Sequence, residues 1–311
     1  MAEWLYEAGL GEARAALVAD DRIVQARIER PGGLRVGTIF EARLVERVAA
    51  GLSRVEGDAG MAVIERVPPG VTEGARLRVE VVRAALPEPG RVKLAKAVAT
   101  DATPVEGPDL LARCQASGHP VRALRPHEPD MLEAAGWSEV LDEAMTGEIA
   151  FAGGALRLSP TPAMTLFDVD GPGAVAALAV AAATAVGEAI VRHDIGGSIG
   201  IDFPTVTGKT ERQAVADAID AVLPQPFERT ALNGFGFLQI VRPRPRASLP
   251  ELLRADPIAA EALALLRRIE RTTPPVPPVQ PAPPRVAAWL VARPDLIAAL
   301  SRRVGVTISI A

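Results

Sequence analysis

Three aspartates of the sequence stand where carboxylates could act together. Asp168 and Asp170 end AMTLFDVD, a segment that alternates like a strand, so their side chains are expected to share one face. Asp202 ends a second strand-like segment, SIGIDF, and an alanine-rich helical stretch separates the two. This order predicts two parallel strands that finish at the same edge of a sheet, where ligand clefts form. We therefore expect the three carboxylates to converge.

Three close carboxylates cannot all stay ionised without a compensating cation. A hard cation with oxygen ligands suits them best, either Mg²⁺ or Mn²⁺. A bound Mg²⁺ can polarise a phosphodiester and activate a water molecule. The residues fit a second interpretation as well, in which Asp168 and Asp170 begin a turn and cap the next helix, and Asp202 is a loop residue. The local pattern leaves both interpretations open.

Lys209 and Arg212 follow the second strand, in TGKTER, and are candidates for phosphate contacts. The segment is not a Walker loop, because Phe203 stands where that motif requires a glycine. The alternative is an ordinary helix start, with Thr207 as its cap and Lys209 in solvent.

Three arginines further along the chain alternate with prolines. In an extended segment they would point the same way and could follow a phosphate backbone. A solvated surface explains them equally well in a chain so rich in arginine. They are Arg242, Arg244 and Arg246.

The composition of the 311 residues is that of a folded protein, with 49% apolar residues, 23% charged residues and a net charge of -4. It excludes wholesale disorder, collagen and coiled coil. Only three of the 34 basic residues are lysines, which is typical of a GC-rich genome, so the number of arginines says little about nucleic acid. The acidic balance argues against a nonspecific DNA-binding protein, and 4% aromatic residues predict sparse base stacking.

The cysteine count and the hydropathy of the chain limit the metal sites and the cellular compartment that can be expected. Cys114 is the single cysteine, so neither a disulfide framework nor a multi-cysteine zinc site is expected. The three histidines have no metal-ligand spacing, and we expect them on the surface or in loops. The N-terminus lacks the pattern of a secretory signal, and the uncharged stretch within 171–187 is too short to cross a bilayer. These features predict a soluble, cytoplasmic protein without membrane contact.

The elements around the aspartates can be outlined from periodicity. Residues 3–30 predict strands with a turn at Asp20 and Asp21, and 36–97 predict five short strands, which suggest a small closed barrel of the OB type. Helices are expected within 99–147 and at 249–271, with a break at Pro257. Seven of the eleven residues 274–284 are proline, which predicts a stiff linker. The tail is expected to be strand, helix and strand, beginning with RVAAWLVA.

Four segments in one order, LFDVDG, RHDIGGSIGIDF, TERQAV and FGFLQIVRPR, resemble the catalytic core of the RNase E/G family over residues 163–246. The resemblance implies an α/β (α+β multi-subdomain) fold. Its parts would be an RNase H-like subdomain (1–35 plus 99–147), an inserted OB-type RNA-binding barrel (36–98), a DNase I-like catalytic, metal-binding subdomain (148–248), and a small C-terminal domain (249–311) that contains the proline-rich linker 274–284.

The same resemblance implies a Mg²⁺-dependent endoribonuclease that cuts single-stranded or structured RNA in RNA processing or decay. Asp168 and Asp202 would hold the metal. Asp170 stands where the family has an asparagine, and this change could tighten metal binding, alter the preferred ion or impair catalysis. RNA would be bound by Lys209, Arg212, Arg242, Arg244, Arg246, Arg43, Lys93, Lys96 and Phe40, the one aromatic residue between Gly37 and Thr100.

The sequence also departs from the family in its accessory parts. The segment 99–147 is too short to hold the family's sensor for a 5′-monophosphate, so we expect activity that does not depend on the 5′ phosphorylation state. The family's zinc-linking cysteine motif is absent, so neither structural zinc nor a zinc-mediated dimer is expected, although a homodimer through the C-terminal domain is. These losses keep an alternative open, a non-catalytic RNA-binding or regulatory relative.

Overall fold

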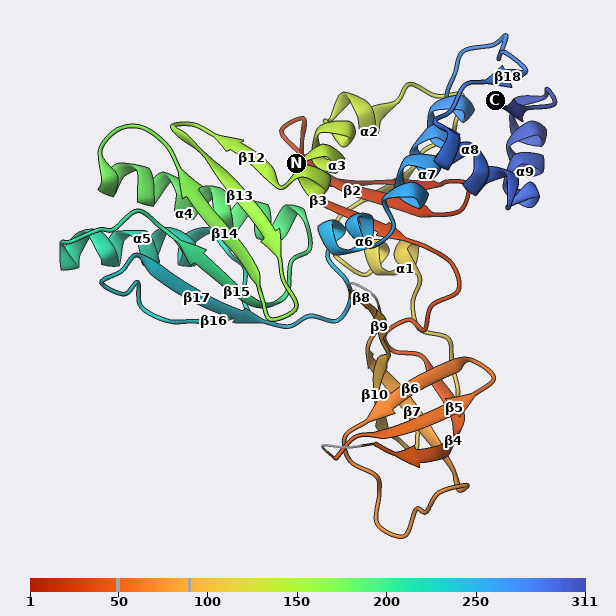
Figure 1. Ribbon diagram of the computed structural model, residues 1–311, viewed down its shortest axis with the longest axis horizontal. Helices are drawn as coiled ribbons and strands as arrows, with labels where there is room; N and C mark the ends of the chain where they lie inside the picture. The colour runs from red at the N-terminus through yellow and green to blue at the C-terminus, as the bar shows by residue number, and fades with distance from the viewer. Residues whose placement is uncertain (49–50, 89–90) are drawn as a thin grey trace. The chain divides into compact units, whose positions relative to one another are not determined.

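The computed structural model describes residues 1–48, 51–88 and 91–311. The fold is mixed α/β, with several sheets and one closed barrel (Figure 1). The chain divides into two compact units, and each unit collects segments that are distant in sequence. The first unit comprises Met1–Pro31, Leu110–Leu141 and Leu252–Ala311, and the second comprises Gly32–Asp109 and Asp142–Glu251.

The first unit contains a four-stranded sheet of order β11-β1-β2-β3. Asp20 and Asp21 both have positive φ, 50° and 59°, as the predicted two-residue turn between strands requires. Helix α1 (Leu110–Gln115) buries Cys114 against this sheet, beside Trp4. The strands are β1 (Glu3–Ala8), β2 (Ala13–Ala19), β3 (Arg22–Glu29) and β11 (Val121–Ala123).

The helices of the C-terminal segment confirm one prediction and correct two. α6 (Leu249–Ala255) and α7 (Pro257–Glu270) are separated at Asp256, whose carboxylate accepts a hydrogen bond from the Ala259 amide at 3.0 Å. RVAAWLVA is a helix, α8 (Pro284–Val291), because Val286 and Leu290 lie one turn apart and both enter the core beside α7. Residues 274–284 are not only a linker, since β18 (Val279–Gln280) pairs with β19 (Ser309–Ile310) after α9 (Pro294–Val304).

A buried network of charges joins the three segments of the first unit. Glu7 is only 4% exposed. Its carboxylate forms ion pairs with Arg14 at 2.8 Å, Arg267 at 2.9 Å and Arg271 at 2.6 Å. Arg267 also reaches Asp130 at 2.6 Å. Asp130 begins the short helix α2 (Met131–Ala134). Burial raises the pKa of Glu7, but the charges of the three arginines lower it by more, so this pKa lies below its ordinary value.

In the second unit, five strands close into a barrel in the order β10-β6-β5-β4-β7. β10 runs parallel to β6 and antiparallel to β7, which closes the barrel. Apolar side chains fill its interior, among them Leu44, Val55 and Val81. The barrel strands are β4 (Ile39–Arg47), β5 (Ser53–Gly57), β6 (Gly60–Ile64), β7 (Arg76–Arg83) and β10 (Ala95–Ala99), and a hairpin of β8 (Leu86–Glu88) and β9 (Arg91–Lys93) precedes β10.

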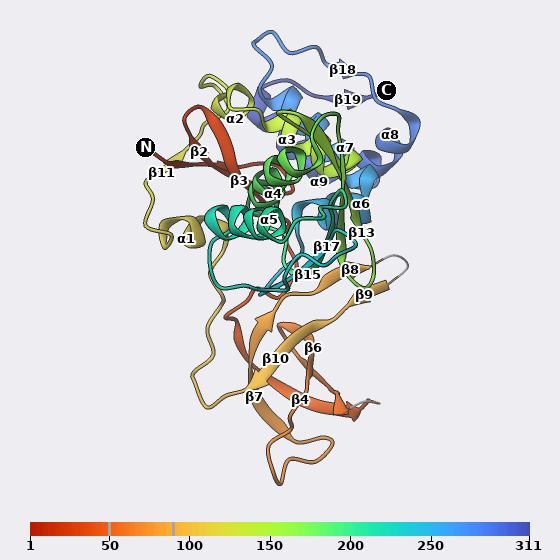
Figure 2. The same cartoon turned by 90° about the vertical axis from the view of Figure 1, so that its left-hand side faces the viewer.

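The second unit also holds a six-stranded sheet of order β12-β13-β14-β15-β17-β16. Its helices α4 (Val175–Arg192) and α5 (Lys209–Val222) lie side by side on one face of it (Figure 2). α3 (Trp137–Thr146) leads into the first strand. The strands are β12 (Glu148–Phe151), β13 (Gly154–Pro160), β14 (Thr165–Asp170), β15 (Gly197–Asp202), β16 (Glu228–Arg229) and β17 (Phe237–Arg242).

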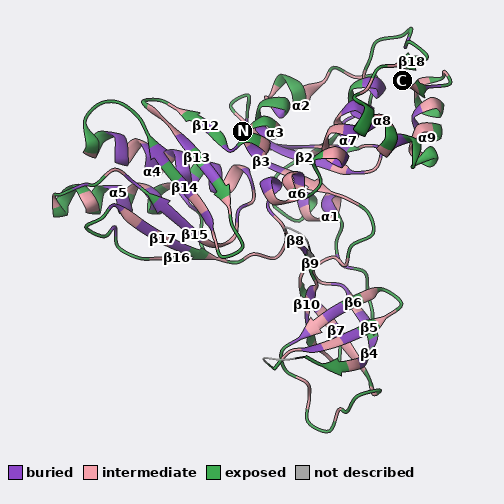
Figure 3. Cartoon of the chain, viewed as in Figure 1, coloured by how far each residue is buried: buried purple, intermediate pink, exposed green. Residues whose placement is uncertain are grey.

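The alternation of buried and exposed residues along these strands fixes which way each side chain points (Figure 3). Phe167 and Val169 of β14, and Ile199 and Ile201 of β15, enter the core under α4 and α5. Their neighbours in sequence therefore point to the opposite face.

α4 is longer than the uncharged stretch suggested. It continues past the uncharged stretch through Glu188 to Arg192, and these 18 residues satisfy the length and composition of a membrane span, which no other described helix does. Half of the helix is nevertheless buried inside the protein, where its alanines and Ile190 belong to the core cluster of the sheet. This burial is that of a core helix.

Candidate active site

Asp168 and Asp202 lie directly beside each other on neighbouring parallel strands. β14 and β15 pair with Asp168 opposite Asp202, which brings their Cα atoms to about 4.8 Å. Both side chains are exposed and point to the face opposite the helices. Among the described residues, neither carboxylate has a hydrogen bond or ion pair with another group. The predicted parallel strands and the approach of these two aspartates are confirmed.

Asp170 extends the same face by one step. It is exposed, lies two residues beyond Asp168, and faces Ala155 of β13. Within residues 1–48, 51–88 and 91–311, no group of three or more histidine, cysteine or acidic side chains is close enough to form a ready-made metal cage. The expected convergence of all three carboxylates is therefore not found in the described part of the chain: Asp168 and Asp202 form a pair, and Asp170 lies two residues further along β14.

A row of side chains across the sheet adds charge that the sequence analysis missed. Arg157 of β13 lies opposite Asp168, and Glu148 of β12 lies opposite Arg157. The Arg157 guanidinium contacts Glu148 at 3.0 Å, and both side chains are more than half exposed, so this pair is weak. The cross-strand register that places Arg157 beside Asp168 was not predicted.

Lys209 begins α5, at the same edge of the sheet as Asp202, and it is exposed. The helix start and the solvent position of Lys209 that the alternative expected are therefore both confirmed, but the N-cap residue is Gly208 and not Thr207, and it makes no side-chain cap. Arg212 donates to the carbonyl oxygens of Val206 at 3.1 Å and Thr207 at 2.7 Å. Arg212 thus holds the loop between β15 and α5 in place, while Lys209, the first residue of α5, stays in solvent.

The proline-spaced arginines lie at the other edge of the sheet. β17 is antiparallel to β15, so Arg242 pairs with Gly197, five residues and about 17 Å from Asp202. Arg244 forms an ion pair with Glu251, and Arg246 contacts Asp194 at 3.0 Å. Burial lowers the pKa of Arg242. The three arginines therefore do not form an extended row that could follow a phosphate backbone. The strand ends at Arg242, and the next two arginines hold the turn into α6.

The barrel residues named for RNA binding have different surroundings. Phe40 is only 6% exposed and belongs to the barrel core, so the prediction that it stacks on bases is wrong. Its alternation with Glu41 turns it inward. Lys96 is paired with Glu65 at 2.6 Å, and Lys93 is exposed, 4.0 Å from Glu88.

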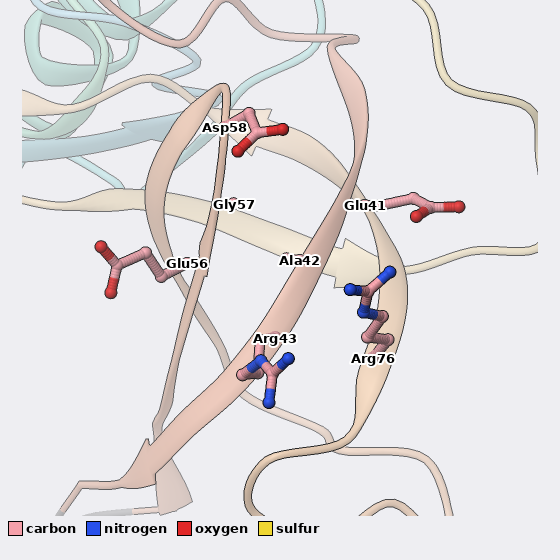
Figure 4. Close-up of a pocket in the computed structure, with 7 residues that line it drawn as sticks. All are labelled: Glu41, Ala42, Arg43, Glu56, Gly57, Asp58 and Arg76. Carbon is pink, nitrogen blue, oxygen red and sulfur yellow. The ribbon is translucent and has the colours of Figure 1, made fainter.

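Arg43 lines a shallow barrel pocket of about 220 Å³ (Figure 4). The pocket also contains Arg76, but three acidic side chains stand around them, Glu41, Glu56 and Asp58. Figure 4 shows the two glutamates pointing outward on opposite sides of the strands. An anionic phosphate would meet mixed charge here, so this pocket is a poorer candidate than the aspartate edge.

His193 is buried, in contrast to the expectation of a surface or loop position. It follows α4 and contacts Glu143 of α3 at 3.1 Å, and Arg192 reaches the same carboxylate at 3.0 Å. Burial raises the pKa of Glu143, while its bond to His193 and the charge of Arg192 lower it by more. Arg192 and His193 therefore fix the C-terminal end of α4 and do not line the aspartate edge.

A comparison with protein-family models and a search of curated proteins find no match to this chain.

Proposed function

We propose that the protein is a Mg²⁺-dependent endoribonuclease that hydrolyses phosphodiester bonds of single-stranded or structured RNA. The observation that carries the proposal is the register of Asp168 and Asp202, two exposed and unpaired carboxylates side by side at the edge where parallel strands end. Mg²⁺ is commonly held by one or two carboxylates together with water and substrate phosphates. A pair of carboxylates therefore fits this ion without a complete protein cage.

Each group at this edge has a separate task in the proposal. Asp168 and Asp202 would hold the ion, which when bound supplies charge at the scissile phosphate and a more acidic water. Lys209 and Arg157 would contact phosphate oxygens and orient the backbone. Attack by the water breaks the bond between phosphorus and the 3′ oxygen, which takes up a proton. The products are a 5′-phosphate and a 3′-hydroxyl.

The barrel supports an RNA substrate. Counted in chain order, its strands close as 1-2-3-5-4, the order of an OB-type barrel, a class that binds oligonucleotides on strands 2 and 3 and adjoining loops. On this assignment the RNA-binding face is β5 and β6. Arg54 stands on β5, and Lys96 on β10 pairs in register with Val63 of β6. The RNase H-like and DNase I-like assignments, the cytoplasmic location and a homodimer through 249–311 belong to the same proposal.

The test is incubation of the full chain with a 5′-labelled single-stranded RNA in Mg²⁺, in Mn²⁺ and in EDTA. We expect cleavage in either metal and none in EDTA, with 5′-phosphate ends on the downstream products. Cleavage that persists in EDTA, or 2′,3′-cyclic phosphate ends, would contradict the proposal.

A non-catalytic RNA-binding relative is the second candidate. It is favoured by the lack of a three-ligand metal group among the described residues and by the additional charge of Asp170. Retention of RNA on a filter without cleavage in either metal would support this candidate over the first.

Asp170→Asn tests whether the third carboxylate is a ligand. If Asp170 contacts the ion directly, we expect the variant to bind Mg²⁺ more weakly by at least about 10- to 100-fold, which is the loss that removing a group hydrogen-bonded to a metal ligand already causes, measured by titration calorimetry. The variant should fold normally, because Asp170 is exposed. An unchanged affinity would place Asp170 outside the metal's ligands.

The 5′ end of the RNA should not affect the rate. With no room for the sensor of the RNase E/G family, we expect equal cleavage of matched RNAs that carry one or three 5′ phosphates, measured in parallel time courses. A rate that falls on the triphosphorylated RNA would contradict this expectation.

A further inference from the structure

One phenylalanine of the described residues stands in solvent, in the loop that leads into β17. Phe235 is 87% exposed, while every other phenylalanine, tryptophan and tyrosine side chain among the described residues is buried or half-buried. One exposed apolar side chain is ordinary on a protein surface. Two further observations distinguish Phe235, the order of its loop and the position of that loop.

Hydrogen bonds within the loop that carries Phe235 hold its backbone in place. The side-chain oxygen of Asn233 accepts hydrogen bonds from the amides of Phe235 at 2.9 Å and Phe237 at 3.0 Å. The Gly236 amide donates to the Asn233 carbonyl at 3.2 Å. Gly236 has a φ of +91°, and a Cβ there would lie 2.2 Å from the carbonyl oxygen of Phe203. The backbone that carries the Phe235 ring is therefore held in one conformation.

The loop lies at the edge of the sheet where the aspartates end. Phe237, the first residue of β17, pairs with Asp202, and the Phe203 amide, one residue after Asp202, donates to the Gly236 carbonyl at 2.9 Å. The ring of Phe235 thus projects from a loop bonded directly to the strand end that carries Asp202.

A solvent-exposed aromatic ring on an ordered loop, next to the edge proposed to bind phosphate, suits the face of a base. Stacking on an aromatic ring accepts any base, because each one has a π face, and an ordered loop lowers the entropic cost of binding. We infer that Phe235 is a stacking platform for one base of the RNA, next to the phosphate that is cleaved. This inference rests on the proposed function and adds a residue that positions the substrate.

The test is a series of RNAs in which one base at a time, on either side of the cleaved bond, is removed to leave an abasic sugar. For the wild-type protein, we expect the KM to rise about 5- to 150-fold at one position of the series, with a much smaller change in kcat. Phe235→Ala should raise the KM on the intact RNA by a similar factor and should no longer respond to the abasic position.

Two matched variants separate stacking from simple hydrophobic contact. Phe235→Trp should restore sensitivity to the abasic position, and Phe235→Leu, which stays apolar without a ring, should not. All three variants should unfold at the wild-type temperature, because the side chain is exposed.

Two results would overturn the inference and leave the nuclease proposal standing. One is that Phe235→Ala still responds to the abasic position, and the other is that the wild type responds to no abasic position. If RNA is retained but not cut, the same series measured as affinity still decides the question. If RNA is neither cut nor bound, both proposals fail. An oligomer that Phe235→Ala dissociates, with RNA kinetics unchanged, would overturn the inference in favour of a protein contact.

Discussion

Asp202→Asn is expected to lower the rate of Mg²⁺-dependent RNA cleavage by about 10²- to 10³-fold, because a catalytic metal supplies several kcal/mol of stabilisation to the transition state. The substitution removes the charge and keeps the size of the side chain. Single-turnover rates on a labelled RNA at saturating protein measure the effect. Asp168→Asn should have an effect of the same order, since the two residues occupy equivalent positions in the register.

The matched control for Asp202→Asn is Asp217→Asn. Asp217 is an exposed aspartate of α5 in the same unit, where it accepts a hydrogen bond from Gln213. Asp217→Asn removes the same charge from the surface, away from the carboxylate pair. The rate of RNA cleavage should therefore stay within about twofold of the wild type, as for ordinary surface changes. Equal losses in the two variants would show that net charge, and not the pair, governs cleavage.

Glu7→Gln is expected to destabilise the first unit by about 3–5 kcal/mol, the usual cost of removing one partner from a buried ion pair. It leaves the guanidinium groups of Arg14, Arg267 and Arg271 buried without the carboxylate that they share. All three tryptophans, Trp4, Trp137 and Trp289, belong to this unit. Urea unfolding followed by tryptophan fluorescence therefore reports on the unit directly.

A surface pair of the same unit provides the control. Glu261 contacts Arg285 at 2.8 Å, and the arginine side chain is 65% exposed, so Glu261→Gln should cost less than about 1 kcal/mol. A loss for Glu7→Gln no larger than that of Glu261→Gln would contradict the view that the buried network holds the segments together.

The contribution of Glu7 also has a direction in pH. Its pKa in the folded protein lies below its ordinary value of 4.5, so the folded state binds fewer protons than the unfolded chain as this group titrates. The stabilisation is complete above pH 4.5 and is lost as the pH falls through the lower pKa of the folded state. Glu7→Gln should therefore flatten the acid limb of the stability curve.

The aspartate edge could be predicted because its information is local. Alternation in AMTLFDVD and SIGIDF, with one long helix between them, is enough to fix two parallel strands and the place where each ends. The five barrel strands are equally local, since short alternating segments and turns mark them. In both cases neighbouring residues in the chain determine the element.

The other features depend on contacts between residues that are distant in sequence, and local sequence patterns do not predict such contacts. Arg242 is at the far edge because β17 runs antiparallel to β15, and Arg157 is beside Asp168 because of a register between strands. Glu7 and Arg267 are 260 residues apart, so their pairing leaves no periodic signal. RVAAWLVA suits either a strand or a helix, and packing beside α7 makes it a helix.

A metal held by Asp168 and Asp202 should contact the phosphate that is cut. An RNA with sulfur in place of one non-bridging oxygen at the cleavage site tests this most directly, because Mg²⁺ prefers oxygen ligands strongly and Mn²⁺ tolerates sulfur better. We predict that one of the two sulfur stereoisomers is cut slowly in Mg²⁺ and that Mn²⁺ restores the rate. The absence of cleavage of unmodified RNA in both metals, or equal cleavage of both stereoisomers in Mg²⁺, would contradict the claim.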